Sequence, residues 1–155
     1  MESQLNRPPL NETRRNSSQL ILKWLLIVSG AFLISAFAAM LLPVATMDSV
    51  HDWLGLGDFP NRPITVYLAR STSLMYGIHG VLMLYTGLTL QHHWRLVKLF
   101  GWLHVVIGVS MLIVDFMASM PWYWTAFEGP PVTLLGVLII YLAKQSFAKN
   151  TPAVL

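Results

Sequence analysis

Four long apolar segments separated by short polar connectors constrain this chain of 155 residues more than any other feature. A membrane-spanning helix needs about 20 mostly apolar residues. The chain is 55% hydrophobic and 11% charged, whereas globular domains average about 25% charged residues. A soluble domain of about 150 residues buries only about 70% of its unfolded surface, so too much apolar surface would stay in water. The pattern predicts an all-α, four-helix transmembrane bundle.

The predicted membrane domain covers residues 20–147, with spans at about 20–44, 64–90, 96–117 and 130–147. The fourth is the shortest, because its uncharged stretch runs only from Gly129 to Ala143. The alternatives are a helix that begins earlier and takes Glu128 into the membrane edge, a span that thins the lipid locally, or a re-entrant segment. Residues 125–131 look like a loop that starts this helix, since Pro fits a first helical turn.

The regions outside the spans are short. Residues 1–19 are polar and are expected to form a disordered tail, and residues 148–155 form a second tail. We expect the first apolar segment to remain as a span and not to be cleaved as a signal, because it is longer than a signal's hydrophobic region. In the connector 45–63, residues 50–57 are typical of a short amphipathic helix that ends at glycines.

The basic residues predict the orientation, because Lys and Arg favour the cytoplasmic side. Eight of the ten fall in or next to the two tails and the connector between the second and third spans, and only Arg62 and Arg70 fall on the other side. Both termini are therefore predicted to be cytoplasmic, in a bacterial-type inner (plasma) membrane. Tryptophans near both predicted boundaries agree with two interfacial belts.

Several function classes are excluded or disfavoured. The chain has no cysteine, which excludes disulfides, iron–sulfur clusters and thiolate zinc sites. No nucleophile elbow, phosphate-binding glycine loop or metal-ligand spacing occurs, so no catalytic or metal residue is predicted. The net charge of +3 lies at membrane edges, and we expect no nucleic-acid partner.

Three ionisable residues fall in the outer half of the predicted bundle: Arg70, Asp115 and Glu128. Each costs about 2.5–3.5 kcal/mol to insert unless it pairs. One interpretation is an ion cluster that clamps three helices together, the second is a polar site open to the outside for an anion or a proton, and the third is simple surface exposure. The second interpretation would make the protein a small transporter.

Two histidines lie at similar predicted depth, His79 on the second span and His104 on the third, and Tyr76 lies one turn before His79. A histidine pair on two helices can hold haem b when nearby glycines admit the porphyrin, and Gly77, Gly80, Gly101 and Gly108 are nearby. The alternative is that these side chains are hydrogen-bonded packing residues without a cofactor.

Small residues and polar groups also recur at helical spacing. Gly101, His104, Gly108, Met111 and Asp115 form one stripe that should face the bundle. Two rows of small residues should allow close helix contacts: Ala31, Ser35 and Ala39 on the first span, and Ala69, Ser73 and Gly77 on the second.

The segments Tyr67–Ser71 and Tyr76–Gly80, with Trp53–Gly57 before them, resemble small four-span bacterial membrane proteins of unassigned function. Arg70 and the pair His79–Gly80 are also similar to a pattern of the DoxX-like superfamily, although the Lys that commonly follows is missing here. The resemblance implies a four-span fold and carries no activity. We therefore expect a non-catalytic membrane protein, self-associating or a subunit of a larger complex, with a haem- or quinone-binding bundle and a transporter as alternatives.

Overall fold

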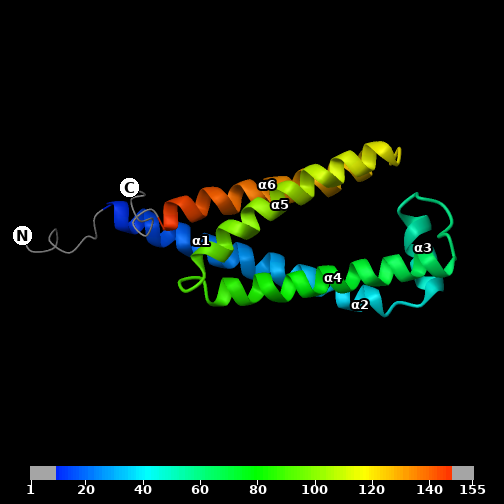
Figure 1. Ribbon diagram of the computed structural model, residues 1–155, viewed down its shortest axis with the longest axis horizontal. Helices are drawn as coiled ribbons and strands as arrows, with labels where there is room; N and C mark the ends of the chain where they lie inside the picture. The colour runs from blue at the N-terminus through cyan, green and yellow to red at the C-terminus, as the bar shows by residue number, and fades with distance from the viewer. Residues whose placement is uncertain (1–9, 148–155) are drawn as a thin grey trace, which may run out of the picture. The chain divides into compact units, whose positions relative to one another are not determined.

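The computed structural model describes residues 10–147, and these residues fold into helices with no strand (Figure 1). The helices are α1 (Leu10–Ile34), α2 (Ala36–Met40), α3 (Val44–Trp53), α4 (Pro63–Leu88), α5 (Trp94–Met117) and α6 (Trp122–Ser146). The prediction of an all-helical protein is confirmed. Three segments of the described residues are long and apolar enough to cross a membrane, namely Arg15–Met40, Trp94–Met117 and Trp122–Ser146.

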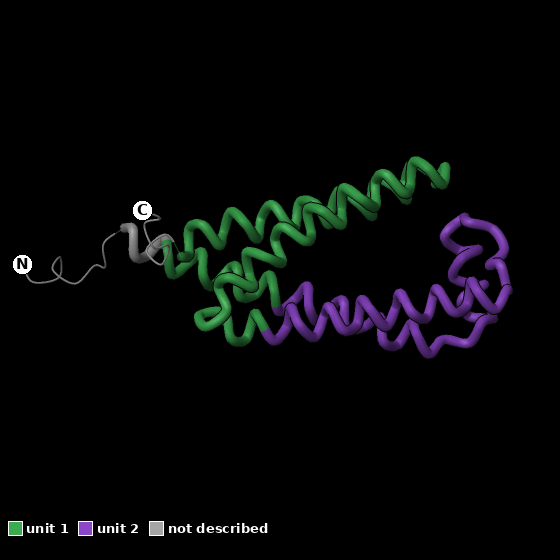
Figure 2. The backbone as a smooth tube through the Cα atoms, viewed as in Figure 1, with its two compact units in different colours: residues 1–26, 86–155 green, residues 27–85 purple. Residues whose placement is uncertain are grey.

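The chain divides into two compact units, shown in different colours in Figure 2. Unit 1 is Met1–Leu26 with Thr86–Leu155, and unit 2 is Ile27–Tyr85. Helices α1 and α4 each contribute to both units, whereas α5 and α6 belong to unit 1 alone. We describe each unit by itself.

In unit 1, α5 and α6 pack against each other along their lengths as an antiparallel hairpin (Figure 1). Glycines allow this approach. A Cβ added at Gly136 would lie 2.6 Å from the Gly101 carbonyl oxygen, and one at Gly108 would lie 2.6 Å from the Thr133 backbone nitrogen. Because real Cβ atoms do not come so close to backbone, only glycine fits at these two positions. Small residues thus bring the helices together, as is common in lipid.

The same hairpin buries the predicted stripe of α5. Gly101, His104, Gly108 and Asp115 are buried, and Met111 is half-buried. The prediction that this stripe faces other helices is therefore confirmed. The opposite faces of α5 and α6 expose large apolar side chains such as Val106, Phe116 and Leu134.

In unit 2, the second half of α1 packs along α4. A Cβ at Gly80 would lie 2.7 Å from both the Gly30 oxygen and the Ile34 nitrogen, and one at Gly77 would lie 2.6 Å from the Phe37 ring. The predicted row on the first span does not make this contact, since Ala31 and Ser35 are exposed. Helix α1 contacts α4 instead through the face that carries Gly30.

In unit 2, the connector between α2 and α4 contains a short helix and a turn. Helix α3 begins at Val44, six residues before the predicted amphipathic run, and ends before Gly55 and Gly57, which have φ values of 74° and 76°. The Phe59 N–H donates to Asp48 Oδ1 at 2.8 Å, and His51 Nδ1 lies 2.7 Å from the Gly57 oxygen. These bonds fold the glycine turn back onto α3.

Three helix boundaries differ from the predictions. Helix α1 begins at Leu10, so the second half of the predicted polar tail is helical, while residues 1–9 and 148–155 lie outside the described part. The first span is interrupted at Ser35, whose hydroxyl donates to the Phe32 oxygen. Residues 125–131 are not a loop: α6 begins at Trp122 and contains Pro130 and Pro131, so the helix starts earlier and takes Glu128 with it.

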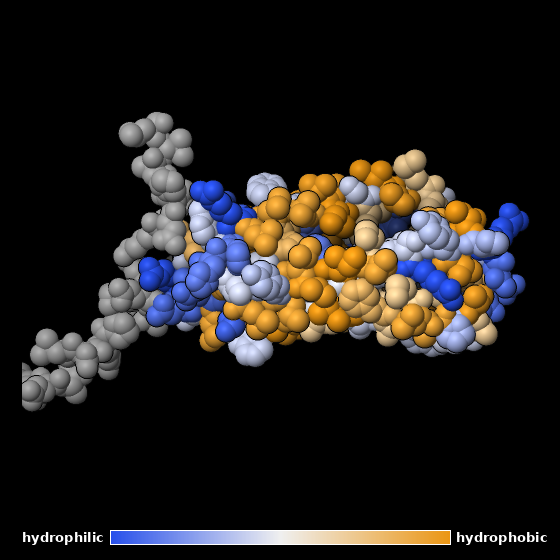
Figure 3. Space-filling view, turned by 60° about the horizontal axis from the view of Figure 1, so that its bottom comes forward, coloured by the Kyte–Doolittle hydropathy of each residue, from blue (hydrophilic) through white to orange (hydrophobic). Residues whose placement is uncertain are grey.

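Hydrophobic side chains cover much of the face seen in Figure 3. On α1 they recur every fourth residue as Leu20, Trp24, Val28 and Phe32, each more than half exposed. A water-soluble protein rarely exposes continuous apolar surface on this scale. The surface therefore suits a lipid environment, in agreement with the three candidate spans.

Candidate functional site

A pair of carboxyl groups lies where α5 ends and α6 begins. Asp115 is two residues from the end of α5, and Glu128 is in the second turn of α6. The connecting turn, residues 118–121, is tight: Ser119 has a φ of 53°, and the Met120 N–H donates to the Asp115 backbone oxygen at 3.0 Å. Pro121, which precedes α6, fixes an extended backbone with ψ of 144°. The hairpin thus sets the two acidic residues opposite each other.

The Asp115 and Glu128 side chains lie close enough to interact electrostatically. Asp115 is only 5% exposed, and its Oδ2 atom has no hydrogen-bond partner. Glu128 accepts a hydrogen bond from the indole N–H of Trp124, one turn earlier on α6. The hairpin therefore places two carboxyl groups close together at one end of unit 1.

The surroundings of this pair limit its other partners. Pro130 and Pro131 lack an N–H, so the carbonyls of Ala126 and Phe127 lose their usual helical donors. The Thr133 hydroxyl, one turn after Gly129, donates to the Gly129 carbonyl at 3.0 Å. The two prolines therefore leave two backbone carbonyls next to Glu128 in the sequence without helical donors.

Arg70, the third member of the predicted cluster, belongs to α4 in unit 2. Its side chain is exposed and its Nη2 atom lies 3.5 Å from the Leu42 carbonyl oxygen, just after α2. This is a long hydrogen bond and a weak one. The structure thus brings Asp115 and Glu128 together, and the pairing of Arg70 with either of them stays a prediction.

The histidines occupy different surroundings. His104 is 4% exposed, and its Nδ1 atom lies 2.8 Å from the Phe100 carbonyl oxygen. Since a carbonyl only accepts, Nδ1 carries the hydrogen in this bond. His79 and Tyr76 are half-buried on α4 in unit 2. Whether His79 and His104 act together stays a prediction.

The glycines predicted to admit a porphyrin are used for helix packing. Within unit 1, Gly101 faces Ile140 and Gly136, and Gly108 faces Thr133 and Gly129. Within unit 2, Gly77 faces the Phe37 ring and Gly80 faces Gly30. Visible absorption spectra of the oxidised and reduced protein would test the haem prediction directly.

Two features were missed by sequence reasoning. The tryptophans as a group were interpreted as two interfacial belts, but Trp124 lies four residues before Glu128, so both are on one helical face. The four-residue spacing of Trp124 and Glu128 has this meaning only because α6 begins at Trp122, so that both residues are helical. The glycine partners Gly129 and Gly136 were also missed, because their pairing depends on how α6 rotates toward α5.

Comparison of the chain with protein-family models, with curated proteins and with solved structures finds no match. The resemblance to DoxX-like proteins at Arg70 and His79 therefore stays a prediction.

Proposed function

We propose that the protein is a four-span integral membrane protein with both termini on the cytoplasmic side of a bacterial-type inner membrane, where it serves as an accessory or structural subunit. The support comes first from the two ends of unit 1. Ser18 Oγ donates to Gln145 Oε1 at 2.8 Å, and Gln19 Nε2 donates to the Ser146 oxygen at 3.1 Å. The start of the α1 span and the end of α6 therefore lie side by side.

This contact bears on the number of crossings. Two points on the same side of a membrane are joined by an even number of crossings. The candidate spans Arg15–Met40, Trp94–Met117 and Trp122–Ser146 are three, so one more is needed. Helix α4 has 26 residues, or about 39 Å at the helical rise of about 1.5 Å per residue, and this exceeds a hydrocarbon core of about 30 Å.

Helix α4 is not one of the three candidate spans, and it carries the polar residues Arg70, Ser71, Thr72, Ser73 and His79. Two observations nevertheless support a crossing. Gly80 packs α4 against the candidate span of α1 through Gly30 and Ile34. Arg70 is exposed and only seven residues from the helix start, so its long side chain can reach the headgroup zone, as basic residues near span ends do.

Labelling of single cysteines tests this topology, and the chain has no native cysteine to interfere. Asp58→Cys should react with an impermeant thiol reagent added to intact cells, and Gln91→Cys should react only after lysis. If α4 did not cross, residue 91 would lie on the same side as residue 58. Reaction of both variants in intact cells would then overturn the four-span proposal.

The subunit role is supported by what the described residues expose. Apolar side chains dominate the outer faces of α1, α5 and α6, and the connectors are too short to form a separate domain. Two differently tagged copies expressed together should co-purify in mild detergent if the protein self-associates. A protein that is monomeric and has no partner protein in both mild detergent and nanodiscs would contradict the subunit role.

The buried, unpartnered oxygen of Asp115 favours a second candidate function, a proton-coupled transporter that binds its proton between Asp115 and Glu128. Infrared spectroscopy tests the proton itself. The protein should show a carbonyl stretch of a protonated carboxylic acid that shifts in D2O, and Asp115→Asn should remove or move it while thermal unfolding stays cooperative. A spectrum identical in wild type and Asp115→Asn would exclude this candidate.

A further inference from the structure

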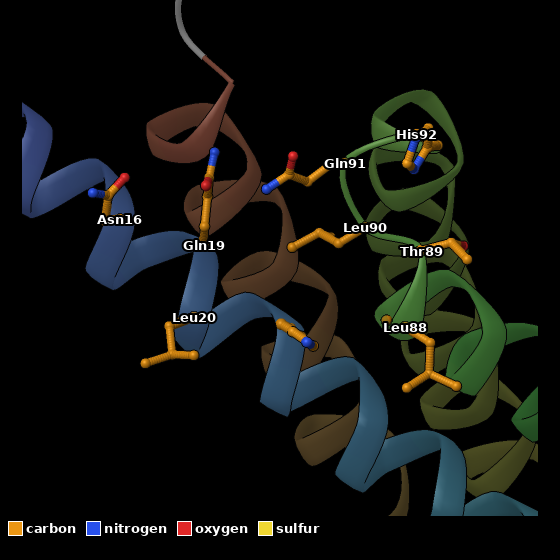
Figure 4. A pocket seen from close by; sticks show the side chains of 10 residues that line it. Asn16, Gln19, Leu20, Leu88, Thr89, Leu90, Gln91 and His92 are labelled. Carbon is orange, nitrogen blue, oxygen red and sulfur yellow. The ribbon is translucent and has the colours of Figure 1, made fainter.

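A cavity of about 410 Å³ lies in unit 1 between the first turns of the α1 span and the segment from Gly87 to His92, where α4 ends. Its volume falls within the range of about 300–1,000 Å³ that is usual for small-molecule sites. In Figure 4 the Gln91 side chain extends from this segment toward Gln19 on α1. No proposed function described above uses this cavity.

The polar lining is rich in hydrogen-bond donors. Lys23 supplies one positive charge, and Asn16, Gln19, Gln91 and His92 carry further side-chain N–H groups. None of the ten lining residues is acidic. Such a lining favours an oxyanion with a single negative charge, because one cation balances it and amide groups bind the remaining oxygens.

The rest of the lining is apolar. Leu20 and Leu88 are 58% and 61% exposed, whereas Leu90 is 4% exposed. A ligand in the polar part would therefore have two exposed leucines beside it. A water-soluble anion gains nothing from these leucines, but the first methylenes of an acyl chain would pack against them.

One wall of the cavity is fixed by other contacts of unit 1. Gln19 donates to the Ser146 oxygen, and its neighbour Ser18 donates to Gln145, so this turn of α1 is tied to the end of α6. Leu90 is held by burial, and the His92 N–H donates to the Thr89 oxygen at 3.0 Å. These contacts hold the backbone of this wall in place, and a fixed wall lowers the entropy cost of binding.

We propose that this cavity binds the headgroup of an anionic phospholipid with one net negative charge, such as a phosphatidylglycerol. Lys23 and the amides hold the phosphodiester, and the acyl chains run past Leu20 and Leu88. Basic pockets between membrane helices on the cytoplasmic side suit anionic headgroups in general. The inference rests on the proposed insertion of α1 for its position at the membrane edge, but not on the number of spans.

Thermal unfolding of the detergent-purified protein, with and without short-chain phosphatidylglycerol, tests the proposal. The lipid should raise the unfolding temperature, because a ligand that binds only the folded state stabilises it. Lys23→Gln should raise the lipid concentration needed for the half-maximal temperature shift by roughly tenfold. This factor corresponds to a charged hydrogen bond of about 1.4 kcal/mol. Lys144→Gln is the matched control, since Lys144 is exposed on α6 and does not line the cavity.

Each other outcome overturns the proposal. An equal temperature shift for wild type and Lys23→Gln would mean that the lipid binds outside this cavity. No shift with phosphatidylglycerol would exclude the site. An equal shift with inorganic phosphate alone would assign the cavity to a soluble anion, and an equal shift with short-chain phosphatidylcholine would assign the effect to acyl chains. The four-span topology is tested by cysteine labelling alone. A failed lipid test would therefore overturn the lipid site without bearing on the topology.

Discussion

The two units pack their helices in the same way but bury different groups. Both use a glycine to bring two backbones together, Gly80 against Gly30 in unit 2 and Gly108 against Gly129 in unit 1. In unit 2 the charged residue of α4, Arg70, stays exposed, whereas unit 1 buries His104 and Asp115. Glycine contacts hold membrane helices together in many proteins, but buried ionisable groups cost free energy and are usually kept for a role. Unit 1 is therefore where function should be sought.

The largest effect is expected from the feature that the units share. Gly80→Leu and Gly108→Leu should each destabilise the protein by more than about 3 kcal/mol, because the added side chain would meet backbone atoms that cannot move aside. Thermal unfolding in detergent measures this. Thr72→Leu on α4 and Ser110→Leu on α5 are exposed controls and should change little. A harmless Gly80→Leu would mean that close packing is confined to unit 1.

The sequence predicted the parts of this fold that depend on composition. Long apolar runs gave the long helices, and the spacing of Gly101, Gly108 and Asp115 identified the buried face of α5. The start of α6 was wrong because Pro130 and Glu128 read as boundary signals, although a helix among other membrane helices tolerates proline. The contact of Asp115 with Glu128 depends on the rotation of α6 and on the tight turn at Ser119. No periodicity within one helix encodes that rotation.

The next effect concerns the carboxyl pair, which has no counterpart among the described side chains of unit 2. Asp115→Ala and Glu128→Ala should each lower the free energy of unfolding, but the double variant should lose about 1–2 kcal/mol less than the sum, because the first substitution already breaks the pair. Chemical denaturation in mixed micelles gives the three values. Strictly additive losses would mean that the two side chains do not interact.

A smaller effect is expected at Trp124. Trp124→Phe keeps an aromatic ring but removes the indole N–H that Glu128 accepts from, so it should cost about 1 kcal/mol in the free energy of unfolding. Trp122→Phe is the matched control, because Trp122 begins the same helix and is 79% exposed. In a Glu128→Ala background, Trp124→Phe should cost clearly less. An equal loss of unfolding free energy in both backgrounds would mean that Trp124 does not act through Glu128 and serves only as an interfacial residue.

The smallest effect is expected at Arg70, where unit 2 offers only a long hydrogen bond to the Leu42 carbonyl. Arg70→Ala should cost about 0.5 kcal/mol, the lower end for a single hydrogen bond, because the guanidinium is exposed and its hydrogen bond to the Leu42 carbonyl is long. Arg62→Ala in the preceding connector is the control. A loss of about 3 kcal/mol would mean instead that Arg70 neutralises a buried acid. Repeating Arg70→Ala in an Asp115→Ala background would then identify that acid, and the contrast between the two units would give way to a single charged network.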